Sequence, residues 1–314
     1  MILSVSRRTD IPNYYSEWFF NRVKEGYLYV RNPINAHQIS KIVLSPNIVD
    51  CIVFWTKNPE NMLPRLDELK KYNYYFQFTL TGYGRDIEPG IPNKRKHLIS
   101  VFHDLSKHIG RERVIWRYDP ILINETYTIA YHLKAFKAIA EKLNGYTDKV
   151  VISFVDLYAK TKRNTENLNI ICPSKGDMCK IAVEMAQIAA TNHMTIESCA
   201  EHMDLQEYGV KHGTCIDKDL IQNIIGYEIV GNKDKNQREE CGCFESVEVG
   251  TYNTCKNGCR YCYANYSYDR VSANICTYNV DSPLLCGVVN ENDVITERKV
   301  KSLKMEQLNF LNLI

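Results

Sequence analysis

The chain has 314 residues, of which 45% are apolar and 24% are charged, and its formal net charge is +2. This composition is ordinary for a globular protein with a sizeable core, and the small net charge gives no argument for a nucleic-acid or membrane partner. No apolar run approaches the length of about 18 residues that a membrane span requires, so none is expected. Residues 1–8 lack the pattern of a signal peptide, and we therefore expect a cytosolic protein.

The 12 cysteines are unevenly distributed along the chain. Only Cys51 lies in the first half, and five of the others fall between Cys241 and Cys262. In a reducing cytosol a disulfide framework is not expected. Clustering of this kind favours ligation of a metal ion or an iron–sulfur cluster.

Short apolar runs alternate with amphipathic runs from residue 1 to about residue 200. The strands expected from this pattern are 2–6, 49–55, 75–81, 114–118, 149–155 and 194–198. The expected helices are 15–24, 60–71, 94–108, 126–143 and 177–192, and an antiparallel hairpin is expected over 27–31 and 38–44. Repeated strand–helix units predict a parallel sheet, either a barrel or an open doubly wound sheet. No Gly-x-Gly-x-x-Gly follows the first strand, which argues against dinucleotide binding.

Polar residues stand where five of these strands end. The carboxyl ends of barrel strands build active sites, so the repetition favours a shared pocket over solvated loop ends. These residues are Arg7, Arg8, Thr9 and Asp10, then Thr56 and Lys57, Thr79 and Thr81, Arg117 and Asp119, and finally Asp156.

After residue 200 the chain becomes rich in loops. A strand over 246–252 is expected to lead directly into the last cysteine cluster, and an amphipathic helix is expected near 300–311. We expect residues 1–200 to form the main α/β part and residues 200–245 to form a cysteine-containing loop region. Residues 246–314 would pack their strand, loop and tail into the same domain.

The last cluster, Cys255-x3-Cys259-x2-Cys262, supplies three thiolates from a single loop. A tetrahedral metal ion or a four-iron cluster takes four ligands, so one position stays open for a distant residue or a substrate. A zinc site that combines Cys259 and Cys262 with two distant cysteines is the alternative. Tyr261, immediately before the third cysteine, and the preceding strand favour an iron–sulfur cluster.

This spacing resembles the Cys-x3-Cys-x-aromatic-Cys signature of the radical S-adenosylmethionine superfamily, with Tyr261 as the aromatic residue. The resemblance implies a [4Fe–4S] cluster on Cys255, Cys259 and Cys262, with S-adenosylmethionine on the fourth iron. It also implies reductive cleavage of S-adenosylmethionine to a 5′-deoxyadenosyl radical, and a reductase, flavodoxin or ferredoxin as electron donor. Tyr261 would lie near the adenine.

Several further segments are similar to the spore photoproduct lyase branch of that superfamily, and the whole chain resembles an uncharacterised bacterial family with this late cysteine motif. In that branch the cluster loop precedes the other matched segments, whereas here it comes last. The resemblance therefore implies a partial (β/α)6-type TIM barrel, circularly permuted so that its first strand comes from the C-terminal region. The matched segments are 4–10, 54–57, 76–81, 87–90 and 117–121.

Position by position, the resemblance makes Lys57 and Thr79 candidates for the carboxylate and amino ends of S-adenosylmethionine. A lysine ammonium suits a carboxylate, although Lys57 could equally be a surface lysine at a strand end. Thr9, Asp10 and Arg117 are further pocket candidates, and Arg117 could instead form a structural ion pair with Asp119. The lyase carries a thiol hydrogen donor close to the position of Thr79, where this chain has Phe78, so the substrate stays open.

Four more cysteines, Cys199, Cys215, Cys241 and Cys243, could complete a closed site holding a second [4Fe–4S] cluster or a zinc ion. Gly242 would let its two neighbours turn toward one metal. The alternative is that Cys199 and Cys215 are small buried residues. The leading hypothesis is a radical enzyme; its rival is a zinc-stabilised barrel with structural cysteines and a binding or hydrolytic role. Nucleic acid as substrate is undecided, since the 21 tyrosines suit base stacking and core packing equally.

Overall fold

The computed structural model describes residues 1–156 and 159–305. Its centre is an eight-stranded sheet in which every neighbouring pair is parallel, with the order β10-β1-β4-β5-β6-β7-β8-β9. The strands are β1 (Ile2–Val5), β4 (Cys51–Thr56), β5 (Tyr74–Thr79), β6 (Val114–Ile121), β7 (Lys149–Phe154), β8 (Thr195–Cys199), β9 (Lys211–Gly213) and β10 (Val247–Glu248). Within the described residues β9 and β10 do not pair, so the sheet is not closed.

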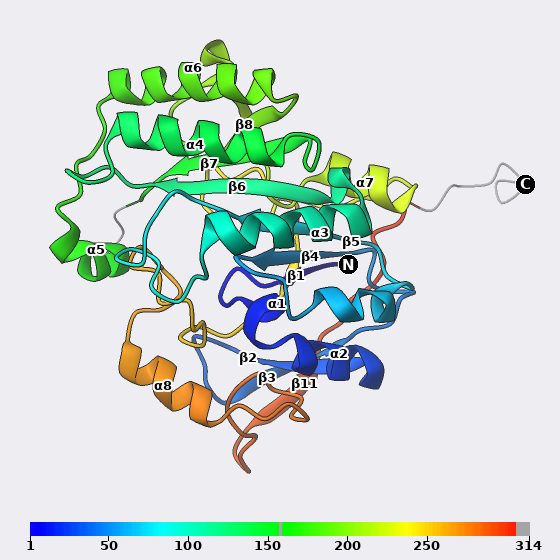
Figure 1. Cartoon of the computed structure of the whole chain (residues 1–314). Coiled ribbons are helices and arrows are strands. Elements are labelled where there is room, and N and C mark those ends of the chain that lie inside the picture. Colours follow the sequence, from blue (N-terminus) through cyan, green and yellow to red (C-terminus); the bar gives the residue numbers. More distant parts are fainter. Residues whose placement is uncertain (157–158, 306–314) are drawn as a thin grey trace, which may run out of the picture.

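One face of the sheet is covered by helices (Figure 1). Alternate residues of each strand point to this face, and Phe54, Phe76 and Trp116 are fully buried there. Both faces are covered, which explains why the strands read as nearly continuous apolar runs. The covering helices are α1 (Ile11–Tyr14), α2 (Ser16–Glu25), α3 (Ile99–Ile109), α4 (Ile129–Leu143) and α6 (Lys175–Thr191).

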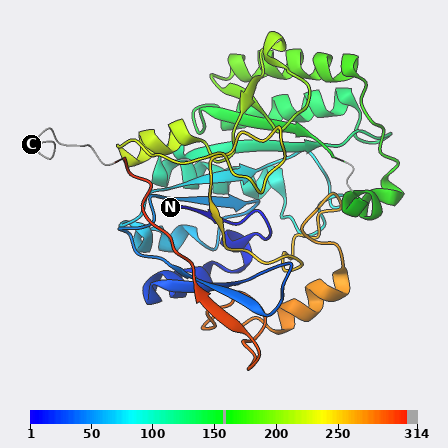
Figure 2. The ribbon, with the colours of Figure 1, turned by 180° about the vertical axis from the view of Figure 1, so that it is seen from behind.

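The opposite face carries a second apolar core that includes Val53, Tyr75 and Ile115. The chain between β8 and β10 crosses this face, which Figure 2 shows from behind. This segment includes α7 (Lys218–Ile225). The Tyr75 hydroxyl and the Gln77 amide both donate to the carbonyl of Cys215, at 2.7 and 2.8 Å. This segment therefore brings its cysteines against the middle of the sheet.

A small separate sheet confirms the expected hairpin. β2 (Tyr27–Arg31) and β3 (Gln38–Val43) pair antiparallel, and β11 (Val294–Glu297) adds to β3 in parallel. The remaining helices α5 (Ala159–Thr165) and α8 (Tyr268–Cys276) were not expected, and neither were α7 and β11.

Two expected helices differ from the structure. Residues 60–71 contain a 3₁₀ helix at Leu63–Leu69, in which amides donate to carbonyls three residues earlier, as from Arg65 to Met62 at 3.0 Å and from Lys70 to Asp67 at 3.3 Å. Residues 300–305 contain no helix; instead the Val230 amide donates to the Leu303 carbonyl at 2.8 Å. The rest of the helix expected near 300–311 falls outside the described residues.

The expected strand 246–252 is only two residues long. Gly250 lies so close to β1 that a Cβ at this position would be 1.8 Å from Ser6 Oγ, which a residue with a side chain cannot tolerate. The chain therefore leaves the sheet early and passes into the cysteine loop. No helix of the described residues is both long and apolar enough to cross a membrane.

Candidate functional site

The cysteine loop, residues 255–262, follows β10 at the edge of the sheet where the parallel strands end. Cys259 is buried, and Cys255 and Cys262 are partly exposed. Burial raises the pKa of all three thiols, and the charge of each of the other two contributes to the rise at Cys259. The three thiols are therefore neighbours on one loop.

Asp10 attaches this loop to the ends of β1 and β4. Its carboxylate accepts from Thr56 Oγ1 at 2.7 Å, from the Lys57 amide at 2.8 Å and from Asn257 Nδ2 at 3.0 Å. It also caps α1 by accepting from the Asn13 amide. Burial raises the pKa of Asp10 although these donors oppose the rise. Asp10, a candidate for cofactor binding, thus has four protein donors and positions the loop.

Lys57 reaches from the end of β4 to the aromatic residue of the cysteine loop. Its Nζ lies 2.8 Å from Tyr261 Oη and 2.8 Å from Glu88 Oε1. Burial alone would lower the pKa of Lys57, but the charges of Glu88 and Cys259 raise it to about 12. Lys57 is therefore a charged, half-buried lysine beside a loop thiol, with only 14% of its side chain exposed.

Glu88 is the centre of this ionic cluster, with only 1% of its side chain exposed. It accepts from Lys57, Lys94 and Tyr261, and from Thr81 Oγ1 at 3.0 and 3.1 Å. Burial alone would raise the pKa of Glu88, yet the two lysines lower it to about 2. The carboxylate is held ionised between two ammonium groups.

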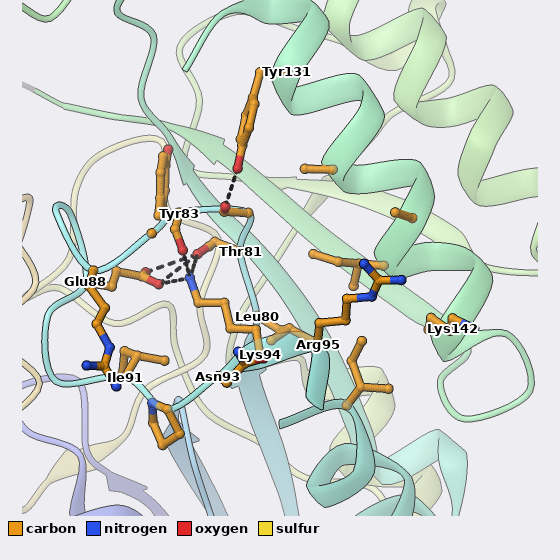
Figure 3. Close-up of a pocket in the computed structure, with 18 of the residues that line it drawn as sticks. Leu80, Thr81, Tyr83, Glu88, Ile91, Asn93, Lys94, Arg95, Tyr131 and Lys142 are labelled. Carbon is orange, nitrogen blue, oxygen red and sulfur yellow. Dashed lines mark hydrogen bonds and ion pairs between the residues drawn. The ribbon is translucent and has the colours of Figure 1, made fainter. Parts of the chain in front are cut away.

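A pocket of about 740 Å³ opens beside Glu88 (Figure 3). Lys94 and Thr81 point toward Glu88 along one wall, and Tyr131 of α4 lies across from them, where its hydroxyl donates to the Gly82 carbonyl. Glu88 therefore separates the pocket from Lys57 and the cysteine loop.

The two threonine candidates occupy different settings. Thr9 is 4% exposed, and its Oγ1 has no hydrogen-bond partner among the described residues. Thr79 ends β5 opposite Arg117 of β6. It is Thr81, two residues farther on, whose hydroxyl joins the Glu88 cluster.

Arg117 forms the ion pair with Asp119 that the sequence left as an alternative. The guanidinium donates to both carboxylate oxygens, and its Nη1 lies 2.7 Å from the sulfur of Cys215. Burial would lower the pKa of Arg117, but Asp119 and the thiols Cys215 and Cys199 raise it. Its position connects it with the second group of cysteines and not with the cysteine loop.

That second group, here called the cysteine quartet, consists of Cys199, Cys215, Cys241 and Cys243. The sulfurs of Cys199 and Cys215 are 2.9 Å apart, and Cys215 and Cys241 are both close enough to Cys243 to influence the pKa of its thiol. The structure thus brings the four predicted cysteines together. Across residues 1–156 and 159–305, however, no three His, Cys, Asp or Glu side chains have the arrangement of a preformed metal site.

Two residues beside the cysteine loop, Glu88 and Lys94, were not predicted to belong to a site. Glu88 lies in a segment that resembles the lyase branch, which was the only signal for it, and its contact with Lys57 spans 31 residues of chain. Arg7, which was expected to line a shared pocket at the strand ends, lies beside the quartet, with its guanidinium carbon 5.4 Å from the centre of the Trp55 ring.

A model of a protein family described as a domain of unknown function, DUF1848, matches residues 2–264. The match includes the cysteine loop and the quartet. No curated protein and no solved structure matches the chain.

Proposed function

The chain belongs to the DUF1848 family, and we propose that it is a radical S-adenosylmethionine enzyme. The proposal rests chiefly on one contact, that between Lys57 Nζ and Tyr261 Oη at 2.8 Å across 204 residues of sequence. This contact joins the predicted S-adenosylmethionine lysine to the loop that carries the three thiols.

The strand order supports a circularly permuted partial barrel of the (β/α)6 type. β10 pairs with β1, and β1 with β4, so a strand from the C-terminal region precedes the N-terminal strand in the order of this sheet. From β10 to β7 the sheet has the order that such a barrel requires when its first strand comes from the C-terminal region.

The cysteine loop has donors that suit a [4Fe–4S] cluster. Cys255, Cys259 and Cys262 would hold three irons and leave the fourth for S-adenosylmethionine. Backbone amides of Ala264 and Asn265 face Cys262, and those of Asn257 and Asp10 face Cys255, so negative charge on the sulfurs would be stabilised. A cluster held by these three cysteines would supply one-electron reduction of the S-adenosylmethionine sulfonium, the chemistry that forms a 5′-deoxyadenosyl radical.

The surrounding side chains would bind and orient the cosubstrate. Lys57 offers an ammonium group to the carboxylate of S-adenosylmethionine and would exchange its contact with Glu88 for it. The Thr9 hydroxyl, which has no hydrogen-bond partner within residues 1–156 and 159–305, could accept or donate a further hydrogen bond. A cytosolic reductase, flavodoxin or ferredoxin would supply the electron.

Formation of 5′-deoxyadenosine under reducing, anaerobic conditions tests this proposal. The reconstituted wild-type chain is expected to contain iron and labile sulfide, to absorb near 400 nm and to cleave S-adenosylmethionine. Cys259→Ala should abolish cleavage, while Cys172→Ala, at an exposed cysteine outside both groups, should leave it unchanged. Zinc without labile sulfide, or cleavage by the Cys259 variant at the wild-type rate, would overturn the assignment and favour a zinc-stabilised barrel.

A further inference from the structure

The cysteine quartet is chemically separate from the cysteine loop. Cys215, Cys241 and Cys243 are buried at 3%, 6% and 2% exposure, and they pack against the apolar face that includes Val53. The loop, in contrast, contacts the lysine and glutamate cluster at the strand ends. The quartet therefore gathers four thiols from three chain segments in one buried place, and the proposed function does not account for this arrangement.

Backbone geometry holds these segments close together. A Cβ at Gly242 would lie 2.7 Å from Thr214 Cγ2, so only glycine lets the Cys241–Cys243 turn pack on the segment that carries Cys215. The Ile216 amide lies 3.4 Å from the sulfur of Cys243, and the Phe244 amide donates to the Ile216 carbonyl at 3.0 Å. Amide groups directed at thiol sulfurs are the outer contacts expected around thiolate ligands.

Two arginines, the buried Arg117 and the partly exposed Arg7, flank the quartet with positive charge. Arg117 Nη1 contacts the sulfur of Cys215, and the charges of Cys243 and Cys215 act on Arg7. Both guanidinium groups lie over the Trp55 ring, at 5.3 and 5.4 Å. Nη2 of Arg7 is buried and has no hydrogen-bond partner among the described residues. Arg117 is paired with Asp119, and Arg7 Nη1 lies 3.4 Å from Asp234, so the two arginines would add a second, favourable contact to an anionic centre beside them.

We propose that Cys199, Cys215, Cys241 and Cys243 bind one Zn²⁺ ion as a closed tetrathiolate site. Binding would displace the four thiol protons, which leave to solvent, and give a centre of net charge −2 facing Arg7 and Arg117. Four thiolates leave no open position, so the site is structural: it fixes the segment between β8 and β10 on the sheet.

The spacing of the sulfurs favours a single ion over a cluster. Around zinc, a Zn–S distance of about 2.3 Å sets tetrahedral sulfurs about 3.8 Å apart. The 2.9 Å contact between Cys199 and Cys215 needs to widen by about 1 Å to reach this value. An iron–sulfur cube would force the thiolates farther apart, because four irons and four sulfides lie between them.

A variant without the loop thiols tests this site on its own. In Cys255→Ser/Cys259→Ser/Cys262→Ser we expect one zinc per chain and no labile sulfide, and cobalt substitution should give thiolate charge-transfer and tetrahedral absorption bands. Absence of bound zinc and of cobalt bands in the folded variant would overturn the proposal. Iron with labile sulfide in this variant would overturn the single-ion assignment.

The converse variant separates this proposal from the proposed function. Cys241→Ser/Cys243→Ser, with the loop intact, should lose the zinc and keep its loop iron, whereas Cys172→Ser/Cys276→Ser, at two exposed cysteines, should keep both. If Cys241→Ser/Cys243→Ser does not fold, alkylation of the wild-type thiols tests the zinc site instead. The quartet thiols are expected to stay protected until a chelator is added, and equal labelling with and without chelator contradicts the site.

Discussion

The cysteine loop and the cysteine quartet differ in the cations that accompany them. Lys57 lies beside the loop and is shared between Glu88 and Tyr261. Arg117 contacts the quartet directly and is fixed by both oxygens of Asp119. A lysine ammonium exchanges partners easily, whereas a planar guanidinium with several bonds is rigid. On the two proposals, the loop region would accept a ligand and the quartet region would stay closed.

The largest expected effect concerns Glu88, on the loop side. Glu88→Gln would leave Lys57 and Lys94 buried without a counter-charge, at 14% and 17% side-chain exposure. We expect a loss of about 3–5 kcal/mol in the free energy of unfolding, measured with urea. Glu297→Gln breaks the exposed pair with Lys41 and should cost less than about 1 kcal/mol. Equal losses in the two variants would remove the distinction between these ion pairs.

The same carboxylate predicts a specific response to acid. Its pKa is lowered from 4.5 to about 2 in the folded chain, so its stabilisation is fully present above pH 4.5 and is lost as the pH falls toward 2. Lys57, Lys94 and Tyr261, which face it, stay protonated throughout this range. Between pH 7 and pH 3 the wild type should lose about 2 kcal/mol more than Glu88→Gln in urea unfolding. If the wild type and Glu88→Gln lost the same free energy of unfolding, the folded chain would not lower the pKa of Glu88.

On the quartet side, Arg117→Lys keeps the positive charge and removes the planar guanidinium that donates to both oxygens of Asp119. We expect zinc to leave the quartet about tenfold faster when a chromogenic chelator is added, because outer contacts of ligands contribute on this scale. The iron content of the loop should not change. Arg111→Lys, in an exposed pair with Asp148, serves as the control. If Arg117→Lys lost loop iron instead, the cysteine loop and the quartet would not be independent of each other.

The smallest effect is expected for Tyr261→Phe, which keeps the ring and removes the hydroxyl between Lys57 and Glu88. One hydrogen bond in a charged cluster contributes about 1 kcal/mol to the free energy of unfolding. Tyr268→Phe, at an exposed tyrosine, should change it by less than about 0.5 kcal/mol. If both variants unfold alike, the Tyr261 hydroxyl does not stabilise the cluster.

The repeated strands and the two cysteine groups followed from sequence patterns, because apolar periodicity and cysteine spacing are local. The strand–helix repeats predicted the parallel sheet and its strands except β9. The 3₁₀ helix at Leu63–Leu69 was not predicted because over so few residues its periodicity resembles that of an α-helix. Glu88 was not predicted as a site residue because Lys57 and Tyr261 lie 31 and 173 residues away in sequence, and no local pattern marks a buried ion pair.

The cysteine loop attaches to Asp10 and Lys57, which are synthesised long before the loop itself. Tyr261 is made 204 residues after Lys57, and translation at about 5–20 residues per second separates the two by about 10–40 s. During this interval Lys57, Glu88 and Lys94 emerge and can pair while the loop thiols do not yet exist. The three charged residues of the ionic cluster are therefore all synthesised before the three cysteines of the loop.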